Sequence, residues 1–436
     1  MKRIACIISL LAGFCLIPSA AMAQAGDGPT LNAADTAWIL TATALVLFMT
    51  IPGLSLFYAG LVARKNVLSV LMNCFIITAV MSVVWVVCGY SIAFGDASPY
   101  WGGFGHLFAK GITTSGMSDG GLPDYLFFAF QMTFFIITPA LMVGAFVERM
   151  KFSAVILFTI FWSILVYAPV CHWVWGGPSN GFMFDWGTKD LAGGIVVHLT
   201  AGIGALVACI MVGPRKGYGS AQLQPHSLPL CVTGTGMLWV GWFGFNAGSG
   251  LAANGDAAQT LVVTHLSAAT ATIVWSLCEK MKHGKASVLG AVTGAIAGLA
   301  AITPASGDVG PMGGLAIGAA SGFICWFAST AVKSKFGYDD SLDVVGVHGV
   351  GGLVGTLMVA FFAAGALGGK SGADYASGAQ FVIQLKSSVI TIVYTLIVTV
   401  VILYIVKAIC GGSLRVTDSE EEEGLDLSAH GESGYN

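Results

Sequence analysis

The chain has 436 residues, of which 56% are hydrophobic and only 9% are charged, and its mean hydropathy is +0.82. Soluble domains carry about 25% charged residues, so this chain is too poor in charge to cover its surface in water and is expected to be a membrane protein. The net charge of −3 excludes a nucleic-acid-binding protein, which needs a basic face. The ten cysteines form no CxxC pair, so we interpret them as small core residues and expect no metal or cofactor.

The first 23 residues have the composition of a secretory signal peptide. Two basic residues precede a short apolar run, Pro18 and an Ala-Met-Ala cleavage signal that ends at Ala23. A first membrane helix is the alternative, but the run is short for a span of about 20 residues. We expect residues 1–23 to be removed, so that the mature chain starts at Gln24, outside the inner membrane of a bacterium.

Eleven apolar segments of the sequence have about the 20-residue length that crosses a bilayer. In chain order they are residues 36–62, 67–94, 124–147, 153–173, 190–213, 227–246, 256–279, 286–302, 311–332, 342–366 and 384–410. They predict an all-α, eleven-span membrane domain over residues 24–411.

The basic residues support this count, because cytoplasmic loops are rich in Lys and Arg. With the N-terminus outside, every odd-numbered segment ends inside, and the C-terminus is cytoplasmic. The ends of the odd-numbered segments hold Arg64, Lys65, Arg149, Lys151, Arg215, Lys216, Lys280, Lys282, Lys285, Lys333, Lys335, Lys407 and Arg415, whereas the opposite side holds only Lys110, Lys189, Lys370 and Lys386.

Two segments repeat one pattern, an aspartate with a histidine eight positions later among glycines. They are Asp190 with His198 in the fifth span and Asp340 with His348 in the tenth. Five spans separate them, so the two halves have opposite orientations, which is the pattern of an inverted repeat. Each histidine lies roughly 12 Å from its entry face in a core of about 30 Å. A lone intramembrane histidine is often structural, but two that meet at the midplane indicate a functional pair.

Aromatic residues gather where several spans end on the outer face. Phe130 and Phe134 share one helix face, and Trp175 and the run around Phe245 and Ser249 end neighbouring spans. An aromatic belt at the membrane interface is the alternative interpretation. Rings and hydroxyls are also the groups that bind a small cation.

The tail, residues 412–436, is polar and holds the acidic run Glu420–Glu423, so it cannot enter lipid. A disordered tail and a docking site for a cytoplasmic regulator both remain open at this point.

Seven motifs carry a resemblance to a known family: FYAGLVARKN (57–66), FQMTFFIITPALMVGAFVERMKFSA (130–154), HWVWGG (172–177), DLAGGIVVH (190–198), GWFGFNAGS (241–249), ITPASG (302–307) and DDSLDVVGVHGVGGLVG (339–355). Over nearly all of residues 30–436 the chain resembles the bacterial ammonium transporters of the Amt/Mep/Rh family. The resemblance implies eleven helices in a 5+5 inverted repeat plus a last helix, assembled as a homotrimer with one pore per subunit.

The resemblance also implies roles for individual residues. It implies an outer ammonium site of Phe130, Trp175 and Ser249, a gate of Phe134 and Phe245, a pore pair of His198 and His348, and support from Asp190, Trp242 and Thr303. The end of the tail resembles the segment that binds a PII-type signal protein. No residue at these pore positions departs from the family pattern.

The chemistry of such a pore follows from the cost of a charge in hydrocarbon. Ammonium, and also methylammonium, can lose a proton and cross as a neutral amine, whereas K⁺ cannot shed its charge. The histidines offer hydrogen-bonding nitrogens without a fixed charge and can relay the proton. The alternatives are an ammonium sensor that signals through its tail, a transporter of another small solute, and a membrane enzyme with histidine-bound metal.

Overall fold

The computed structural model describes residues 29–435 apart from 119, 221 and 222, and the expected signal peptide, residues 1–23, lies outside the described residues. The described residues form helices joined by loops, with only isolated β-bridges between them. The all-helical fold class is therefore confirmed.

Ten helical stretches are long and apolar enough to cross a membrane. They are α2 to α3 (Ala33–Leu61), η2 to α5 (Arg64–Phe94), α6 (Asp124–Phe146), α7 to α8 (Phe152–Trp175), η6 (Gly194–Leu199) with α10 (Thr200–Val212), α11 (Leu228–Gly248), α12 (Gly255–His283), α14 (Pro311–Phe327) with η7 (Ala328–Val332) and α15 (Lys333–Phe336), η8 (Val345–Gly349) with α16 (Val350–Phe362), and α17 (Ser377–Ile409). The eighth expected span contains the shorter apolar helix α13 (Val288–Ile302).

Each expected span contains a helix, and most starts lie within three residues of the expectation, but the fifth and the last differ by more. The fifth begins at Gly194 rather than at Asp190, because the Asp190 carboxylate lies before the helix and accepts its first N–H groups. The last begins at Ser377, earlier than expected, since a polar first turn still continues the helix. Apolar composition marks the middle of a membrane helix better than its ends.

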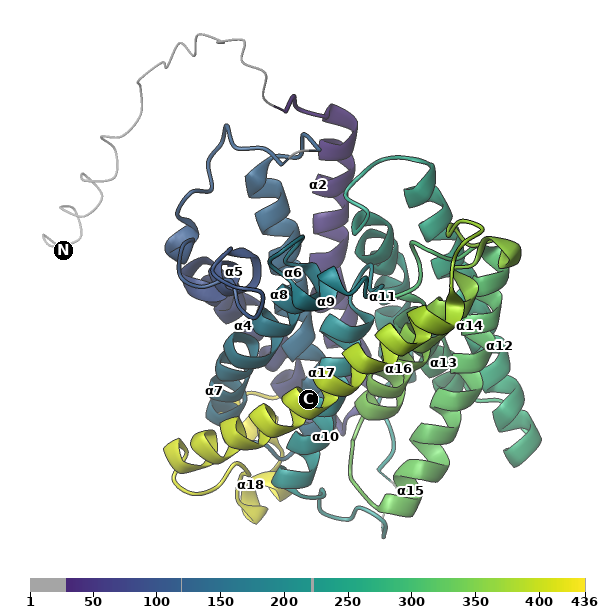
Figure 1. The fold of residues 1–436 in the computed structure, drawn as a ribbon. Helices are drawn as coiled ribbons and strands as arrows, with labels where there is room; N and C mark the ends of the chain where they lie inside the picture. Colours follow the sequence, from purple (N-terminus) through teal and green to yellow (C-terminus); the bar gives the residue numbers. More distant parts are fainter. Residues whose placement is uncertain (1–28, 119, 221–222, 436) are drawn as a thin grey trace, which may run out of the picture.

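Figure 1 shows one bundle in which the last helix, α17, crosses diagonally over α10 and α16. The start of α2 lies at the upper end of the bundle, and the tail helix α18 (Asp418–Glu423) lies at the lower end. The start of α2 and the tail helix α18 therefore lie at opposite ends of the bundle. We call the lower end, where the tail packs, the tail face.

The two helices that carry the histidines touch through glycines. A Cβ placed on Gly202 of α10 would lie 2.2 Å from the Cα of Gly349, and one placed on Gly352 would lie 2.8 Å from the Cβ of His198. Glycine lets two backbones approach closely in a membrane bundle. This crossing sets how near His198 can come to the opposite helix.

We expect Gly202→Ala to destabilise the protein by about 1–3 kcal/mol, because the added methyl group overpacks the crossing. Its matched control is Gly351→Ala, where the nearest atom to an added Cβ is the Cys325 Sγ at 3.5 Å, an ordinary contact. Thermal unfolding of both variants in detergent measures the difference. Equal melting temperatures for the two variants would show that the helix crossing accommodates the added methyl group without strain.

Candidate functional site

Two imidazoles from opposite halves of the chain meet inside the bundle. His198 lies in η6 and His348 lies in η8, and both short segments are π-helical starts of spanning helices. The ring centroids are 5.2 Å apart with planes 17° apart, and the two Nδ1 atoms are 3.2 Å apart. Both side chains are buried, with 1% and 3% exposure. π-Helical turns often occur at functional sites.

A hydrogen bond between two Nδ1 atoms fixes what the other ring nitrogens can do. In a neutral pair, one Nδ1–H donates to the lone pair of the other Nδ1. The donating ring then has an accepting Nε2, and the accepting ring has an Nε2–H that donates. The Nε2 of His198 has no hydrogen-bond partner among the described residues. The pair can therefore offer one acceptor and one donor to a small guest.

The histidines line a narrow cavity that is otherwise apolar. Its volume is about 10 Å³ for the centre of a water-sized molecule, which is about the room that one such molecule needs. The other lining residues are Met49, Leu54, Phe57, Ile137, Leu141, Val197, Leu238, Trp242, Phe245 and Ile296. A permanent ion would find few groups here to replace its water, and such a transfer is costly.

A chain of aromatic rings leads to this cavity. Phe134 and Phe245 have centroids 4.4 Å apart, Phe130 lies 5.0 Å from Phe134, and Trp175 lies 5.8 Å from Phe134. Phe245 is in turn 6.0 Å from His198. The three phenylalanines are buried, whereas Trp175 is partly exposed. The rings therefore connect an accessible end to the histidines.

Asp190 forms hydrogen bonds both to Trp175, at the partly exposed end of the ring chain, and to the start of η6. Its carboxylate accepts the backbone N–H groups of Gly193, Gly194, Ile195 and Val196, and its carbonyl accepts the Trp175 indole N–H at 2.7 Å. Asp340 similarly accepts the Val345 N–H at the start of η8, at 2.7 Å. A carboxylate is favourable at a helix N-terminus. Both histidine segments thus begin on an aspartate cap.

The hydroxyl groups of Thr303 and Ser249 have hydrogen-bond partners that could not be predicted from the sequence. The Thr303 hydroxyl accepts from the Trp242 indole at 2.9 Å and donates to the Leu299 carbonyl, so it orients Trp242 rather than lining the cavity. Trp242 stacks on His198 at 5.4 Å. Ser249 is partly exposed at the end of α11 and donates to the Phe245 carbonyl at 2.8 Å. Both hydroxyls therefore support the ring chain.

Gln384 of α17 is a site residue that the sequence reasoning missed. Its fully buried amide accepts the Lys189 N–H at 2.8 Å and donates to the Lys189 carbonyl at 2.7 Å and the Thr356 carbonyl at 3.0 Å. Gln384 therefore fixes the backbone of Lys189, the residue before Asp190, and it does so from α17, a helix that carries neither histidine. The feature of the sequence that could have identified it is a single amide side chain near the start of an apolar span.

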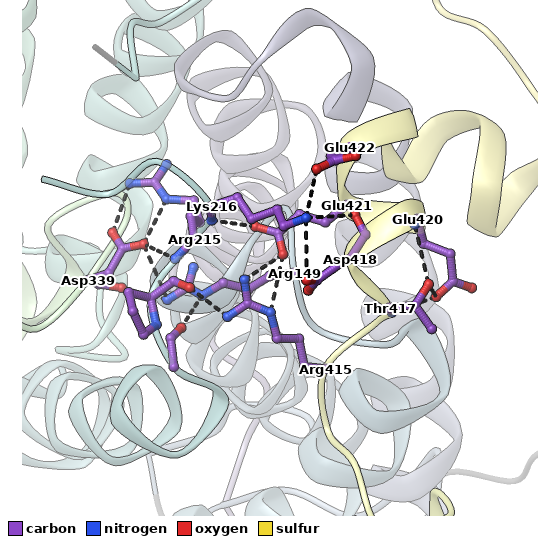
Figure 2. A network of polar contacts seen from close by, with 12 residues as sticks. Arg149, Arg215, Lys216, Asp339, Arg415, Thr417, Asp418, Glu420, Glu421 and Glu422 are labelled. Carbon is purple, nitrogen blue, oxygen red and sulfur yellow. Dashed lines mark hydrogen bonds and ion pairs between the residues drawn. The ribbon is translucent and has the colours of Figure 1, made fainter. Parts of the chain in front are cut away.

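A second missed cluster lies at the tail face (Figure 2). Arg149 is fully buried and donates to the Gly213 and Asp339 carbonyls, while Arg215 pairs with Asp339 and Glu148, each at 2.8 Å. Burial alone would raise the pKa of the Asp339 carboxyl, but the Arg215 hydrogen bonds hold that pKa below its usual value. The pair is therefore ionised at neutral pH.

The tail continues this network. Glu421 accepts from the Arg415 guanidinium and from the Lys216 backbone N–H at 2.7 Å, and Asp426 accepts the Ser69 N–H at 2.8 Å. Residues 418–423 and 425–430 are helical, and the second of these helices packs against α4 (Val67–Val84) and η2 (Arg64–Asn66). The described tail is ordered, so the disordered alternative is wrong for these residues.

Within the described part of the chain, no group of three or more His, Cys, Asp or Glu side chains is arranged to hold a metal ion. The histidine pair has no such third ligand beside it.

The ammonium transporter family model matches residues 37–435. An ammonium transporter of Aquifex aeolicus is 47% identical over 413 residues, which is 93% of this chain and 94% of that protein. The chain belongs to the ammonium transporter family. Among solved structures, Mep2 of Saccharomyces cerevisiae has a TM-score of 0.82 at 33% identity, covering 90% of this chain and 89% of that one. A structure described as a sensor Amt protein has a TM-score of 0.85 at 29% identity, covering 91% and 98%.

We expect Gln384→Leu to lower the stability of this family member by about 1–3 kcal/mol, because it leaves the partly buried N–H and carbonyl of Lys189 without the partner that Gln384 supplies. The control Gln259→Leu removes one hydrogen bond, to the Val309 carbonyl, from a half-buried amide. Thermal unfolding in detergent compares the two. A Gln384→Leu variant as stable as Gln259→Leu would mean that the clamp on Lys189 contributes little.

Proposed function

We propose that this protein transports ammonium by carrying it as neutral ammonia past the His198–His348 pair. The observation that carries the proposal is a hydrogen-bonded pair of buried imidazoles in an otherwise apolar cavity with room for about one small molecule. The relatives are named ammonium transporters, which supports the same substrate. Methylammonium is a second, larger substrate of the same chemistry.

Recognition begins at the partly exposed end of the ring chain. Phe130, Trp175 and Ser249 bind ammonium there, because aromatic faces attract a cation with about 0.5–2 kcal/mol. Phe134 and Phe245 form the gate below them. Their rings, with centroids 4.4 Å apart and planes tilted by 34°, close the path to water, so a molecule that passes must leave its hydration shell.

Ammonium then loses a proton, since desolvation lowers the pKa of a cationic acid. Ammonia fits the pair, whose one acceptor and one donor match the donor and acceptor of the guest. The histidines also relay the released proton. K⁺ has no neutral form, and the apolar cavity holds no charge to compensate it.

The membrane arrangement in this proposal has eleven spans in a 5+5 inverted repeat plus α17, with the N-terminus outside and the tail in the cytoplasm. The distribution of basic residues supports counting α13 as the eighth of these spans. With α13, the basic ends of α12 and α15 lie on one side, whereas without it they lie on opposite sides. The setting is a bacterial inner membrane, where three copies assemble with one pore each.

We expect liposomes with the wild-type protein to take up ammonium and exclude K⁺, and His198→Asp and His348→Glu to admit K⁺ at least about tenfold faster. The reason is that a carboxylate in the cavity supplies the charge that a permanent cation needs. Ammonium-gradient currents and a K⁺-sensitive dye measure the two fluxes.

The neutral variant His348→Gln is the control and should still exclude K⁺. If His198→Asp and His348→Glu both exclude K⁺ while remaining folded, the neutral-pore account is wrong. Absence of ammonium uptake by the wild type would contradict the transport function itself.

We further propose that the tail binds a PII-type signal protein. The support is its ordered position and the exposed apolar side chain of Leu427, which is 54% exposed on α19 (Leu425–His430). An ammonium sensor is the second candidate, supported by the likeness to the solved structure described as a sensor Amt protein.

We expect Leu427→Asp to weaken binding of a PII-type protein about tenfold, because a partner would bury this side chain. Calorimetry with the purified proteins measures the affinity, and Met281→Asp, another exposed apolar position far from the tail, is the control. Unchanged binding in Leu427→Asp would exclude this contact. Ammonium-dependent binding without any ammonium flux would favour the sensor.

A further inference from the structure

Another cavity lies at the tail face, between the end of the first span and the ordered tail. It has a volume of about 490 Å³ for the centre of a water-sized molecule, which is enough for a small organic ligand. Its walls come from η2, the end of α18, α19 and the last residues of the tail, and include Arg64, Lys65, Glu423, Asp426, Leu427 and Tyr435. We call this cavity the tail pocket.

Three carboxylates on the walls of the tail pocket, those of Glu423, Asp426 and Glu432, form no ion pair with any residue that the structure describes. Asp426 is only 3% exposed. Its Oδ1 accepts the Ser69 N–H at 2.8 Å, whereas its buried Oδ2 has no hydrogen-bond partner among the described residues. A buried carboxylate oxygen without a partner is costly, so it calls for a donor from outside the chain.

The basic side chains of the tail pocket are directed to other groups. The Lys65 ammonium donates to the Glu421 carbonyl at 3.0 Å and also to the Glu422 carbonyl. The Arg64 guanidinium lies over the Tyr435 ring, 5.1 Å from its centre. Three carboxylates therefore outweigh two cations that are engaged elsewhere, and the pocket favours a cationic ligand.

The arrangement of the carboxylates favours an extended cation over a single metal ion. Within the described part of the chain, no three His, Cys, Asp or Glu side chains are close enough together to hold one metal ion. A ligand that reaches all three carboxylates must therefore carry its charges at separate positions. The pocket walls also include Leu427, which is 54% exposed, and the Tyr435 ring. Methylene groups pack on such surfaces, and aromatic faces attract ammonium groups.

We propose that the tail pocket binds a linear polyamine. One ammonium group donates to Asp426 Oδ2, and the others pair with Glu423 and Glu432. The methylene groups between them pack against Leu427 and the Tyr435 ring. Because the pocket joins η2 to both tail helices, the bound polyamine holds the tail on the bundle. A cytoplasmic source of the polyamine rests on the membrane orientation given with the proposed function.

Calorimetry of the full-length protein in detergent, at constant ionic strength, tests the binding of spermidine. We expect spermidine to bind at least about tenfold more tightly than butylamine or Mg²⁺, because only the polyamine reaches several carboxylates at once. Equal binding of butylamine or Mg²⁺ would reduce the site to a general attraction of cations and refute the proposal. Binding of trilysine without binding of spermidine would also refute it, in favour of a docking site for a basic peptide.

Two variants of the tail pocket test the named carboxylates. Asp426→Asn should weaken spermidine binding at least about tenfold, the effect of losing a charged hydrogen bond at a buried position. Its amide oxygen can still accept the Ser69 N–H. Glu423→Gln should weaken binding about threefold, because an exposed ion pair contributes less. The matched control is Glu422→Gln, whose carboxylate pairs with Lys216 outside the pocket (Figure 2) and which should bind as the wild type does. Wild-type affinity in both pocket variants would overturn the site.

Amide hydrogen exchange of α19 tests the effect on the tail. Saturating spermidine should slow exchange of residues 425–430 at least about threefold in the wild type but not in Asp426→Asn. Unchanged exchange in the wild type with spermidine bound would contradict the stabilisation of the tail. Both measurements are made without ammonium, so their failure leaves the transport function intact. A wild type that binds spermidine but moves no ammonium would contradict only that function.

Discussion

The contact on which the structure depends is the 3.2 Å hydrogen bond between the Nδ1 atoms of His198 and His348. A buried imidazole without a partner is costly, and a charged one is more costly still. Pairing two neutral rings satisfies one nitrogen of each without introducing a charge. The remaining nitrogens stay available in a space that water fills poorly. In the function proposed here, uncharged hydrogen-bonding groups in an apolar cavity favour a guest that can lose its proton over a permanent ion.

Much of the surrounding structure serves to hold this pair. Gly202 and Gly349 let the two helices cross at close range, and the Asp190 and Asp340 caps fix where η6 and η8 begin. Trp242 stacks on His198 and is itself held by Thr303. Both histidine segments are π-helical. Two segments of similar structure that face each other can form one nearly symmetric centre.

The sequence predicted the helices and the pair of histidines, because both depend on local patterns. Apolar length marked each span, and the Asp–His spacing marked the two related segments without any alignment. Gln384 and the Arg149 cluster were missed for a different reason. Their partners, such as Lys189 and Asp339, are close only after folding, and no periodicity in the chain encodes such contacts. Thr303 was expected to support the pore residues, but its partners, the Trp242 indole and the Leu299 carbonyl, could not be named from the sequence.

Two adjacent aspartates connect the tail to the pore. Asp339 is bonded to Arg215, whose neighbour Lys216 donates to Glu421 of the tail, and Asp340 caps η8. A single peptide bond thus joins the ionic network of the tail face to the turn that carries His348. The Arg215–Asp339 ion pair in this connection is buried, with 11% and 0% of the two side chains exposed, so losing one partner would leave an uncompensated charge there. The turn that carries His348 is therefore the place where the network of the tail face and the cavity of the histidine pair meet.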